Sequence, residues 1–402
     1  MNGSVPSPRI ATKPKRILVV ANTFPPEEQG GGGRVAGDCA LGMRALGYEV
    51  AVLTTRLHSG SWRMFPQPED WNGCAVYRWY PPNVYSLRKA LGKPAWLKAL
   101  WTLWDAVNPL SRWIVGRWIR TWKPDLIVSH NLKGMGYGLP SLFVQKAAYV
   151  HVLHDVQLIE PSGILYAGRF GNPNGPGLSS RIHIRLMRRA FQKVRKVAAP
   201  SDFLLNFHAE RGFFPDAILK KIRNPVEIPE GEGVPERVLF VVGASVYKGL
   251  PEALELWDRL NWTDWALVVV GGGDALEMLQ QRAESDPRIR VLGNLHRNAY
   301  FEQLGRAGIL LHLSRCLEGW PMAMAEARSL GIPVLASKAG GSVDFEADGH
   351  IEWVEPGDLE ASVRAAERFR EEFDQIRPSA HFPDARTYAQ SLLDWGWEPP
   401  PE

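Results

Sequence analysis

The chain has 402 residues, which is too long for one compact core and fits two α/β domains of ordinary size. Its 45% hydrophobic and 22% charged residues exclude a mostly disordered chain. Cys39, Cys74 and Cys316 are too few for a disulfide framework and form no zinc-type cluster, which favours a reducing compartment. Because the sequence has neither a signal-peptide pattern nor an 18-residue apolar run, we expect a soluble cytoplasmic protein.

The charge is divided unequally between the two halves of the chain. Residues 1–200 carry 27 Lys and Arg against 10 Asp and Glu, whereas residues 201–402 carry 20 against 33. This asymmetry predicts two domains with different partners. The partner of the first, basic domain should be anionic.

A first domain is predicted over residues 15–224, after a polar tail at 1–14. Short apolar runs typical of buried parallel strands alternate with helical stretches. A Gly-rich loop, Pro25–Gly33, follows the first strand, and the helical pattern of Arg34–Leu46 ends at Gly47. The predicted strands are Arg16–Ala21, Tyr48–Thr54, Ala75–Trp79, Asp125–Ser129, Ala148–Leu153 and Val197–Ala199.

The alternation restarts after the polar linker Asn224–Pro229 and predicts a second domain over 225–375. The predicted strands are Arg237–Val242, Ala266–Val270, Ile289–Leu292, Ile309–Leu313, Pro333–Ala336 and Ile351–Val354. The predicted helices are Pro251–Leu260, Ala275–Ala283, Ala299–Arg306, Pro321–Leu330 and Leu359–Phe373. We expect the segment 376–402, with its amphipathic stretch Ala385–Trp395, to pack back toward the first domain. The predicted fold class is α/β, with two Rossmann-like domains whose parallel sheets face a central cleft.

The most informative motif is the segment Ser314–Ala327. It places Glu318 and Glu326 eight residues apart across a strand-to-helix junction, with Gly319 and Pro321 between them. Glycine permits close approach of the backbone, and proline suits the first position of a helix. The free N–H groups at such a junction can bind a diphosphate, with one carboxylate available on each side of it.

This segment resembles the E-x7-E region of the retaining glycosyltransferases of family four, which have the GT-B fold. Several other segments match the family in the same order. They are Gly30–Gly33, Pro124–His130, His154-Asp155, Asn224-Pro225-Val226, Lys248-Gly249, Gly271–Asp274, Leu292-Gly293, Gly331–Val334 and Gly340–Asp344. The resemblance extends from Arg16 to about Phe373.

The resemblance implies a catalytic set of Glu318 at the donor sugar, His154 near the transferred sugar and Lys248 at the departing diphosphate. It further implies that Glu326 binds the donor ribose and that the backbone of Gly319, Trp320, Pro321 and Met322 contacts phosphate or sugar oxygens. Gly293, Asn294 and Leu295 match the segment that receives the nucleobase. Gly31, Gly32 and Ser245 complete the predicted donor-binding residues. Since no DxD motif stands at a strand end, we expect no metal and no cofactor besides the nucleotide diphosphate sugar itself.

One position departs from the family pattern. Ala244 stands where the family usually has an arginine before the KG element, so one cation of the diphosphate clamp is missing. Arg34, Arg169 and Arg315 are candidate substitutes. Several of the matched residues also have structural alternatives. His154 can be a packed or capping histidine, and Asp344 can cap a helix or turn. Asp155 and His130 can be structural, Lys248 can be an ordinary surface lysine, and Gly30–Gly33 can be only a flexible loop.

Other functions fit the pattern less well. A dinucleotide enzyme would carry an acidic ribose partner after the second strand, where this chain has Arg56, so only an NADP enzyme remains open. A related GT-B epimerase or phosphorylase is disfavoured by the E-x7-E match. A protein that binds a nucleotide sugar without turning it over stays open because of Ala244.

The stretch Ser86–Lys123 contains eight Lys and Arg residues, one acid and six tryptophans, and Arg181–Lys196 adds seven basic residues without an acid. Such helices must partly cover the first sheet, but a cationic surface with tryptophans also suits an anionic membrane, here the inner face of the plasma membrane. No nucleic-acid recognition module accompanies them. The family resemblance implies a retaining, metal-independent hexosyltransferase that uses a UDP- or GDP-linked sugar. Its expected acceptor is a lipid-linked or membrane-proximal glycan precursor in polysaccharide biosynthesis.

Overall fold

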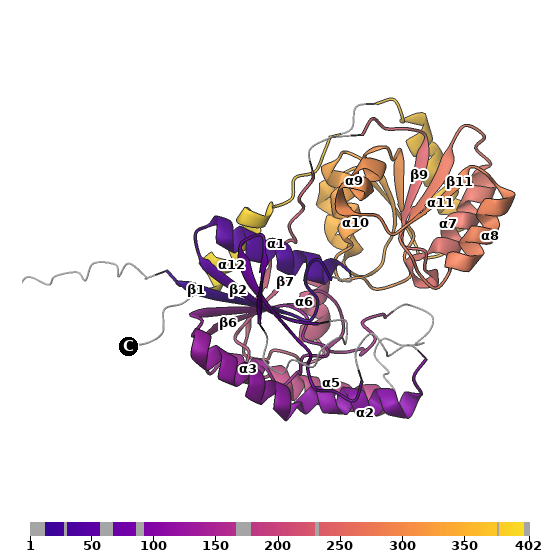
Figure 1. Cartoon of the computed structure of the whole chain (residues 1–402). Coiled ribbons are helices and arrows are strands. Elements are labelled where there is room, and N and C mark those ends of the chain that lie inside the picture. The colour runs from indigo at the N-terminus through magenta and orange to yellow at the C-terminus, as the bar shows by residue number, and fades with distance from the viewer. Residues whose placement is uncertain are drawn as a thin grey trace, which may run out of the picture.

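A computed structural model describes residues 13–27, 30–56, 67–85, 92–165, 178–229, 233–375 and 378–397. It has two α/β domains, each built on one sheet (Figure 1). The first sheet has the strand order β3-β4-β2-β1-β5-β6-β7-β8, and the second has the order β11-β10-β9-β12-β13-β14. All pairings are parallel except that of β3 with β4 at the edge of the first sheet, so the predicted fold class is confirmed.

The first domain contains these elements in chain order: β1 (Arg16–Ala21), α1 (Gly31–Ala45), β2 (Glu49–Thr55), β3 (Pro68–Trp71), β4 (Cys74–Trp79), α2 (Ala95–Val107), α3 (Pro109–Trp122), β5 (Leu126–Ser129), α4 (Pro140–Phe143), β6 (Ala148–Val152), α5 (Leu178–Phe191), β7 (Lys196–Ala199), α6 (Asp202–Ala209) and β8 (Ile218–Lys221).

The second domain and the C-terminal segment contain β9 (Val238–Val242), η2 (Val246–Lys248), α7 (Leu250–Leu260), β10 (Ala266–Val270), α8 (Leu276–Ser285), β11 (Ile289–Gly293), α9 (Arg297–Gly305), β12 (Ile309–His312), α10 (Met322–Ser329), β13 (Val334–Ser337), η3 (Gly340–Asp348), β14 (Ile351–Val354), α11 (Leu359–Glu371) and α12 (Ala385–Gly396).

Both faces of the first sheet are buried, which explains why β1 is apolar at every position after Arg16. Leu18 and Val20 belong to one core cluster, and Ile17 and Val19 belong to another. Because successive side chains of a strand point to opposite faces, these clusters lie on the two sides of the sheet. Helices α2, α3 and α5 cover one side, and α1 with α12 covers the other (Figure 1).

Helix α12 crosses back to the first domain and packs on α1. Its residues Tyr388 and Leu392 are fully buried in the same cluster as Val35 of α1. Gly42 permits this approach, because a Cβ atom there would lie 2.0 Å from the carbonyl oxygen of Ala385.

Three local features differ from the sequence expectations. Gly31–Gly33 form the first turn of α1 instead of a loop, with Gly30 at the N-cap in a left-handed conformation (φ 79°). Strands β3 and β8 were not predicted, because both are edge strands with mostly exposed side chains and lack an apolar run. Some parts of the predicted segments lie outside the described residues. They are the tail at 1–12, Arg169, residues 86–91 of the basic stretch, and the ends 376–377 and 398–402 of the C-terminal segment.

Candidate active site

A cavity of about 420 Å³ lies between the two domains, where the carboxyl ends of their strands meet. In open α/β sheets this edge is the usual ligand site. The first domain lines it with Asn22 and Thr23 after β1, Gly30–Gly33, Asn131 and Lys133 after β5, and His154, Asp155 and Gln157 after β6. The second domain lines it with Tyr247 and Lys248 of η2, Cys316–Trp320 after β12, and Met322.

Lys248 and Glu318 form an ion pair in this cavity, with 3.7 Å between Nζ and Oε2. The Glu318 carboxylate raises the pKa of Lys248, although burial opposes that shift. Burial would raise the pKa of Glu318, but Lys248 and the neighbouring His312 outweigh it and hold the pKa below its usual value. The pair therefore keeps both charges at neutral pH.

The backbone of η2 sets the position of Lys248. Gly249 ends this short helix with φ 82°, and a Cβ atom there would lie 2.0 Å from the carbonyl oxygen of Leu313. Only glycine fits this close approach, which holds η2 against the end of β12. Lys248 is consequently brought beside the loop that carries Glu318.

One oxygen of Glu318 has no partner among the described residues. Its Oε1 atom is buried without a hydrogen bond, and the nearest basic group, Nε2 of His312, lies 3.8 Å away. Burial lowers the pKa of His312, and the Glu318 carboxylate opposes that shift. A buried carboxylate oxygen without a donor is costly, and in the wall of a cavity it is an acceptor prepared for a ligand hydroxyl.

The junction between Glu318 and α10 presents free backbone amides. Within the described part of the chain, the N–H groups of Gly319, Trp320, Met322 and Ala323 donate to no protein acceptor. A Cβ atom on Gly319 would lie 2.4 Å from the carbonyl oxygen of His154, so the two domains touch at this glycine. The indole of Trp320 stacks on Phe345, with ring centroids 4.0 Å apart, which fixes this residue of the junction.

The histidine segment of the first domain also reaches the cavity. His154 lies beside the first turn of α1, since a Cβ atom on Gly32 would stand 3.3 Å from its ring. Its Nε2 atom is 2.7 Å from Nδ1 of His130, and the two rings are nearly parallel, with 13° between their planes. Burial lowers the pKa of His154 to about 4, so its side chain is neutral at pH 7.

Several predicted residues do not line this cavity. Glu326 is buried in the second domain, where it accepts hydrogen bonds from Arg34 of α1 and from Tyr300. Gly293 ends β11, which lies two strands away from β9, and Asn294 and Leu295 follow it. Ser245 and Pro321 are not among the residues that line the cavity. The structure thus brings Gly31, Gly32, His154, Lys248, Glu318, Gly319, Trp320 and Met322 together around one cavity.

Ala244 does not face the cavity. Its side chain is fully buried in the core of the second domain, and its carbonyl oxygen accepts from the N–H of Ala275. Two candidate substitutes for the missing arginine are engaged elsewhere, since Arg34 pairs with Glu326 and Arg315 pairs with Glu252. Neither of these two cations lies in the cavity wall in this structure.

The sequence analysis did not single out Asn131, Lys133, Tyr247 or His312. Lys133 is half-buried, donates to the carbonyl oxygen of Pro161 and lies near Asp155, which also accepts from Asn131 at 2.7 Å. Both Asn131 and Lys133 directly follow the predicted strand that ends at Ser129. Polar residues after a buried parallel strand are a signal that would have indicated them.

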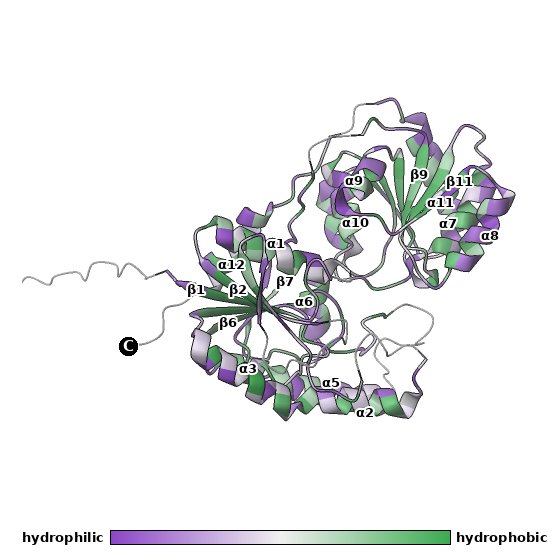
Figure 2. Cartoon of the chain, in the orientation of Figure 1, coloured by the Kyte–Doolittle hydropathy of each residue, from purple (hydrophilic) through white to green (hydrophobic). Residues whose placement is uncertain are grey.

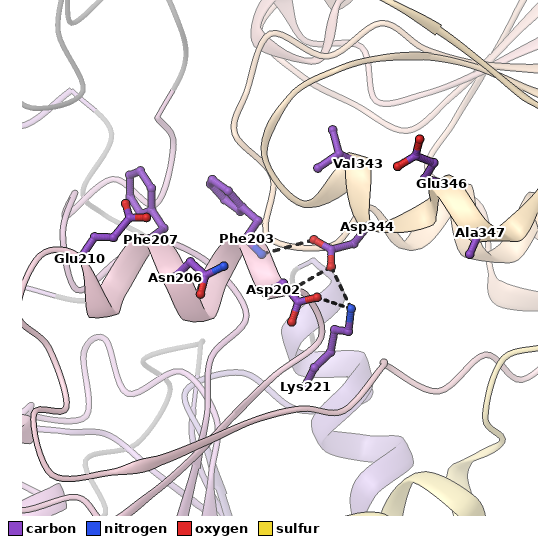
Figure 3. Close-up of a pocket in the computed structure, with 10 residues that line it drawn as sticks. All are labelled: Asp202, Phe203, Asn206, Phe207, Glu210, Lys221, Val343, Asp344, Glu346 and Ala347. Atoms are coloured by element: carbon purple, nitrogen blue, oxygen red, sulfur yellow. Dashed lines mark hydrogen bonds and ion pairs between the residues drawn. The ribbon is translucent and has the colours of Figure 1, made fainter.

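A second, open hollow of about 820 Å³ lies where α6 meets η3 (Figure 3). Asp344 of the second domain accepts hydrogen bonds from the backbone N–H groups of Asp202 (2.9 Å) and Phe203 (3.3 Å), and it also pairs with Lys221. Asp344 therefore caps a helix, as the structural alternative in the sequence analysis predicts. The capped helix belongs to the other domain.

Two features are absent from the part of the chain that the structure describes. No group of three or more His, Cys, Asp or Glu side chains lies close enough together to hold a metal ion. No described helix is both long and apolar enough to cross a membrane.

Comparisons with known proteins identify the family. Residues 30–219 match the model of the glycosyl transferase 4-like domain, and residues 222–375 match that of the glycosyl transferases group 1. No curated protein sequence matches the chain.

Similar folds occur among solved structures. Sucrose-phosphate synthase from Thermosynechococcus elongatus is 15% identical over 94% of this chain and 93% of its own, with a TM-score of 0.70. HepE of Anabaena in complex with UDP is 16% identical over 95% and 96%, with a TM-score of 0.62. The lipopolysaccharide outer core galactosyltransferase WaaB is 14% identical over 94% and 99%, with a TM-score of 0.58. At these identities the likeness shows the fold.

Proposed function

The chain belongs to the group 1 glycosyltransferases with the GT-B fold, which use nucleotide sugars, and from that premise we propose that it is a retaining, metal-independent hexosyltransferase. The single observation that carries the proposal is the cavity between the domains, where Lys248, Glu318 and the free amides after Glu318 converge. A cation and a row of N–H groups suit a diphosphate, and an unpartnered carboxylate oxygen suits a sugar hydroxyl.

We propose that the donor lies along the carboxyl ends of the second sheet. Its diphosphate would accept hydrogen bonds from Lys248 and the N–H groups of Gly319 and Trp320. The unpartnered Oε1 atom of Glu318 would accept a hydroxyl of the transferred sugar. Ser245 and Gly293–Leu295 would receive the more distant nucleoside. A ribose contact with Glu326 would require its carboxylate to share or release Arg34.

The reaction breaks the bond between the anomeric carbon and the diphosphate oxygen, and the electron pair leaves with the diphosphate. The acceptor oxygen then bonds to the same face of that carbon, and its proton is lost to the departing phosphate. Lys248 and the amide dipoles stabilise the negative charge on the leaving group, which is where preorganised positive dipoles have their largest effect. His154 contributes at the sugar on the opposite wall of the cavity.

We propose that the first domain holds a lipid-linked or membrane-proximal glycan acceptor. Asn131, Lys133 and Asp155 supply hydrogen-bonding groups and one cation on that wall. HepE is described in complex with UDP-glucose and WaaB as a lipopolysaccharide galactosyltransferase. These two relatives make a UDP-linked hexose and an envelope glycan the first candidates to test.

We further propose that helices α2, α3 and α5 contact an anionic membrane. Apolar side chains that stand 42–69% exposed gather on this side, including Trp96, Leu100, Leu103, Val107 and Trp113. Arg181, Arg185 and Arg188 of α5 are exposed nearby, and Figure 2 shows apolar and polar residues mixed along these helices. Tryptophan prefers the membrane interface, and each basic residue near an anionic surface contributes about 1 kcal/mol.

The test is a panel of UDP-, GDP- and ADP-sugars, measured first by thermal shift and then by donor hydrolysis and transfer to lipid-phosphate acceptors. We expect one donor to stabilise the protein and to be turned over. Lys248→Met should lower kcat by about 100-fold, whereas Lys338→Met, an exposed lysine of the same domain, should leave kcat unchanged. Donor binding without hydrolysis or transfer would contradict the proposal and favour a non-catalytic nucleotide-sugar-binding protein.

A further inference from the structure

The contact between His130 and His154 is a hydrogen bond whose direction matters for the site. It joins Nδ1 of His130 to Nε2 of His154 at 2.7 Å, so one of these nitrogens must carry the proton and the other must accept it. Burial lowers the pKa of both side chains, and the neighbouring imidazole lowers that of His130 further. Both rings are therefore neutral, and each carries one N–H group.

Only two arrangements satisfy these conditions. In the first, Nδ1–H of His130 donates to Nε2 of His154, and the proton of His154 lies on its Nδ1 atom. In the second, Nε2–H of His154 donates to Nδ1 of His130, and the proton of His130 lies on its Nε2 atom. The arrangements differ at the two nitrogens that take no part in the shared bond.

The free nitrogen of His130 distinguishes the two arrangements. His130 is 1% exposed, and its Nε2 atom is buried without a hydrogen bond to any described residue. In the second arrangement this atom would be a buried N–H donor without an acceptor, which native structures strongly avoid. In the first arrangement it is only an unoccupied lone pair, a less severe deficit.

The free nitrogen of His154 has a different environment. His154 lines the cavity, and its Nδ1 atom is not among the buried atoms of the described residues that lack a partner. We infer that His130 is a positioning residue that holds His154 in the Nδ1–H form, so that His154 presents a hydrogen-bond donor to the substrate in the cavity. This inference rests on the proposed function for the identity of the substrate, but the tautomer itself does not.

The consequence is chemical. A neutral Nδ1–H group donates to an oxygen of the donor sugar and cannot accept the proton of the acceptor hydroxyl. His154 therefore orients and stabilises the sugar, and the acceptor proton must leave by the departing phosphate. The first domain contributes a fixed dipole opposite the Glu318 carboxylate, with His130 as its support.

The direct test is the nitrogen spectrum of the ligand-free protein with ¹⁵N-labelled histidine, in which two-bond ¹H–¹⁵N couplings identify the protonated nitrogen. Single His130→Asn and His154→Gln variants assign the signals. We expect both rings in the Nδ1–H form, which is the less common form of free histidine. Both rings in the Nε2–H form would overturn the inference, whether or not the protein proves to be a glycosyltransferase.

A second measurement separates positioning from simple packing. His130→Asn offers an amide N–H near the place of Nδ1–H, whereas His130→Leu offers none. We expect His130→Leu to lower kcat at least tenfold with less than a threefold change in donor KM, and His130→Asn to restore most of that loss. If kcat in the two variants follows only their melting temperatures, His130 is a packing residue and the inference fails.

Discussion

Arg34 of α1 forms an ion pair with Glu326 of α10 across the boundary between the two domains. The carboxylate that the sequence assigns to the donor ribose is thus already bound to a cation of the opposite domain. Glu326 is 3% exposed, and burial raises its pKa, whereas Arg34 lowers it. The pair thus joins the two domains through a residue that is also a predicted donor contact.

A double-mutant cycle of Arg34→Met and Glu326→Gln measures this link. Removing one partner takes away the ion pair of the other, so each single variant should lose about 1–3 kcal/mol of unfolding free energy, and the double variant should lose less than their sum. Denaturant unfolding gives these values. Strictly additive losses would show that the pair contributes no coupling.

The same Glu326→Gln variant tests the ribose contact. We expect donor binding, measured by titration calorimetry, to weaken by about 1–3 kcal/mol because a charged hydrogen bond is lost. An unchanged affinity would remove Glu326 from the donor site.

Asp344 provides a second link between the domains, since it caps α6 of the first domain from η3 of the second. Asp344→Ala should lower kcat/KM about tenfold. Ser201 at the same helix terminus donates to the carbonyl oxygen of Gly319, so loss of the cap should shift the junction between Glu318 and α10. Asp358→Ala is a matched control, since Asp358 caps α11 within one domain. Each variant should lose about 1 kcal/mol of stability. Equal kinetics in the two variants would contradict the role of Asp344.

Ala244 is buried in the core, so restoring the arginine of the family pattern should not restore a phosphate contact. Ala244→Arg should destabilise the protein by more than about 3 kcal/mol, because it buries a cation without a partner. Val246→Arg, at a neighbouring position that is 51% exposed, is the control and should stay within about 0.5 kcal/mol of the parent. A stable and more active Ala244→Arg variant would show that the position can face the donor.

Asp38 of α1 predicts a pH dependence of stability. Burial raises the pKa of its carboxyl to about 6, with Arg297 opposing the shift, and its Oδ2 atom is buried without a partner among the described residues. Because the folded carboxyl holds its proton more tightly than the unfolded one, the stability contribution is present below about pH 4. It is lost as the pH rises through 6.

We therefore expect the unfolding free energy to fall by about 3 kcal/mol more between pH 4 and pH 7.5 in the parent than in Asp38→Asn. Denaturant titrations of both proteins across this range provide the measurement. Parallel pH profiles would show that Asp38 titrates normally in the folded protein.

The exposed apolar face of α2 and α3 predicts binding to anionic vesicles that weakens with salt. Replacing both Trp96 and Trp113 with serine should at least halve the fraction that sediments with phosphatidylglycerol vesicles at low salt. Val234→Ser, at an 81% exposed position of the second domain, should not change it. No sedimentation of the parent protein at low salt would refute the membrane contact.

The amino-acid sequence by itself determined the buried strands and the order of the motifs, but not the exposed edge strands β3 and β8. Runs such as Arg16–Ala21 and Ala266–Val270 are buried on both faces, and local apolar content is sufficient to indicate such strands. The junction from Glu318 to Met322 was likewise visible, because its glycine, proline and carboxylates act over a few neighbouring residues.

Only the tertiary structure decided which side chains meet. Arg34 is 292 positions from Glu326, and His130 is 24 positions from His154, so no local pattern records either contact. The burial of Ala244 also depends on the packing of a whole domain, not on its neighbours in the chain. Contacts between distant residues arise from the folding of the backbone around both sheets, and this is why only the tertiary structure decides the partners of the site residues.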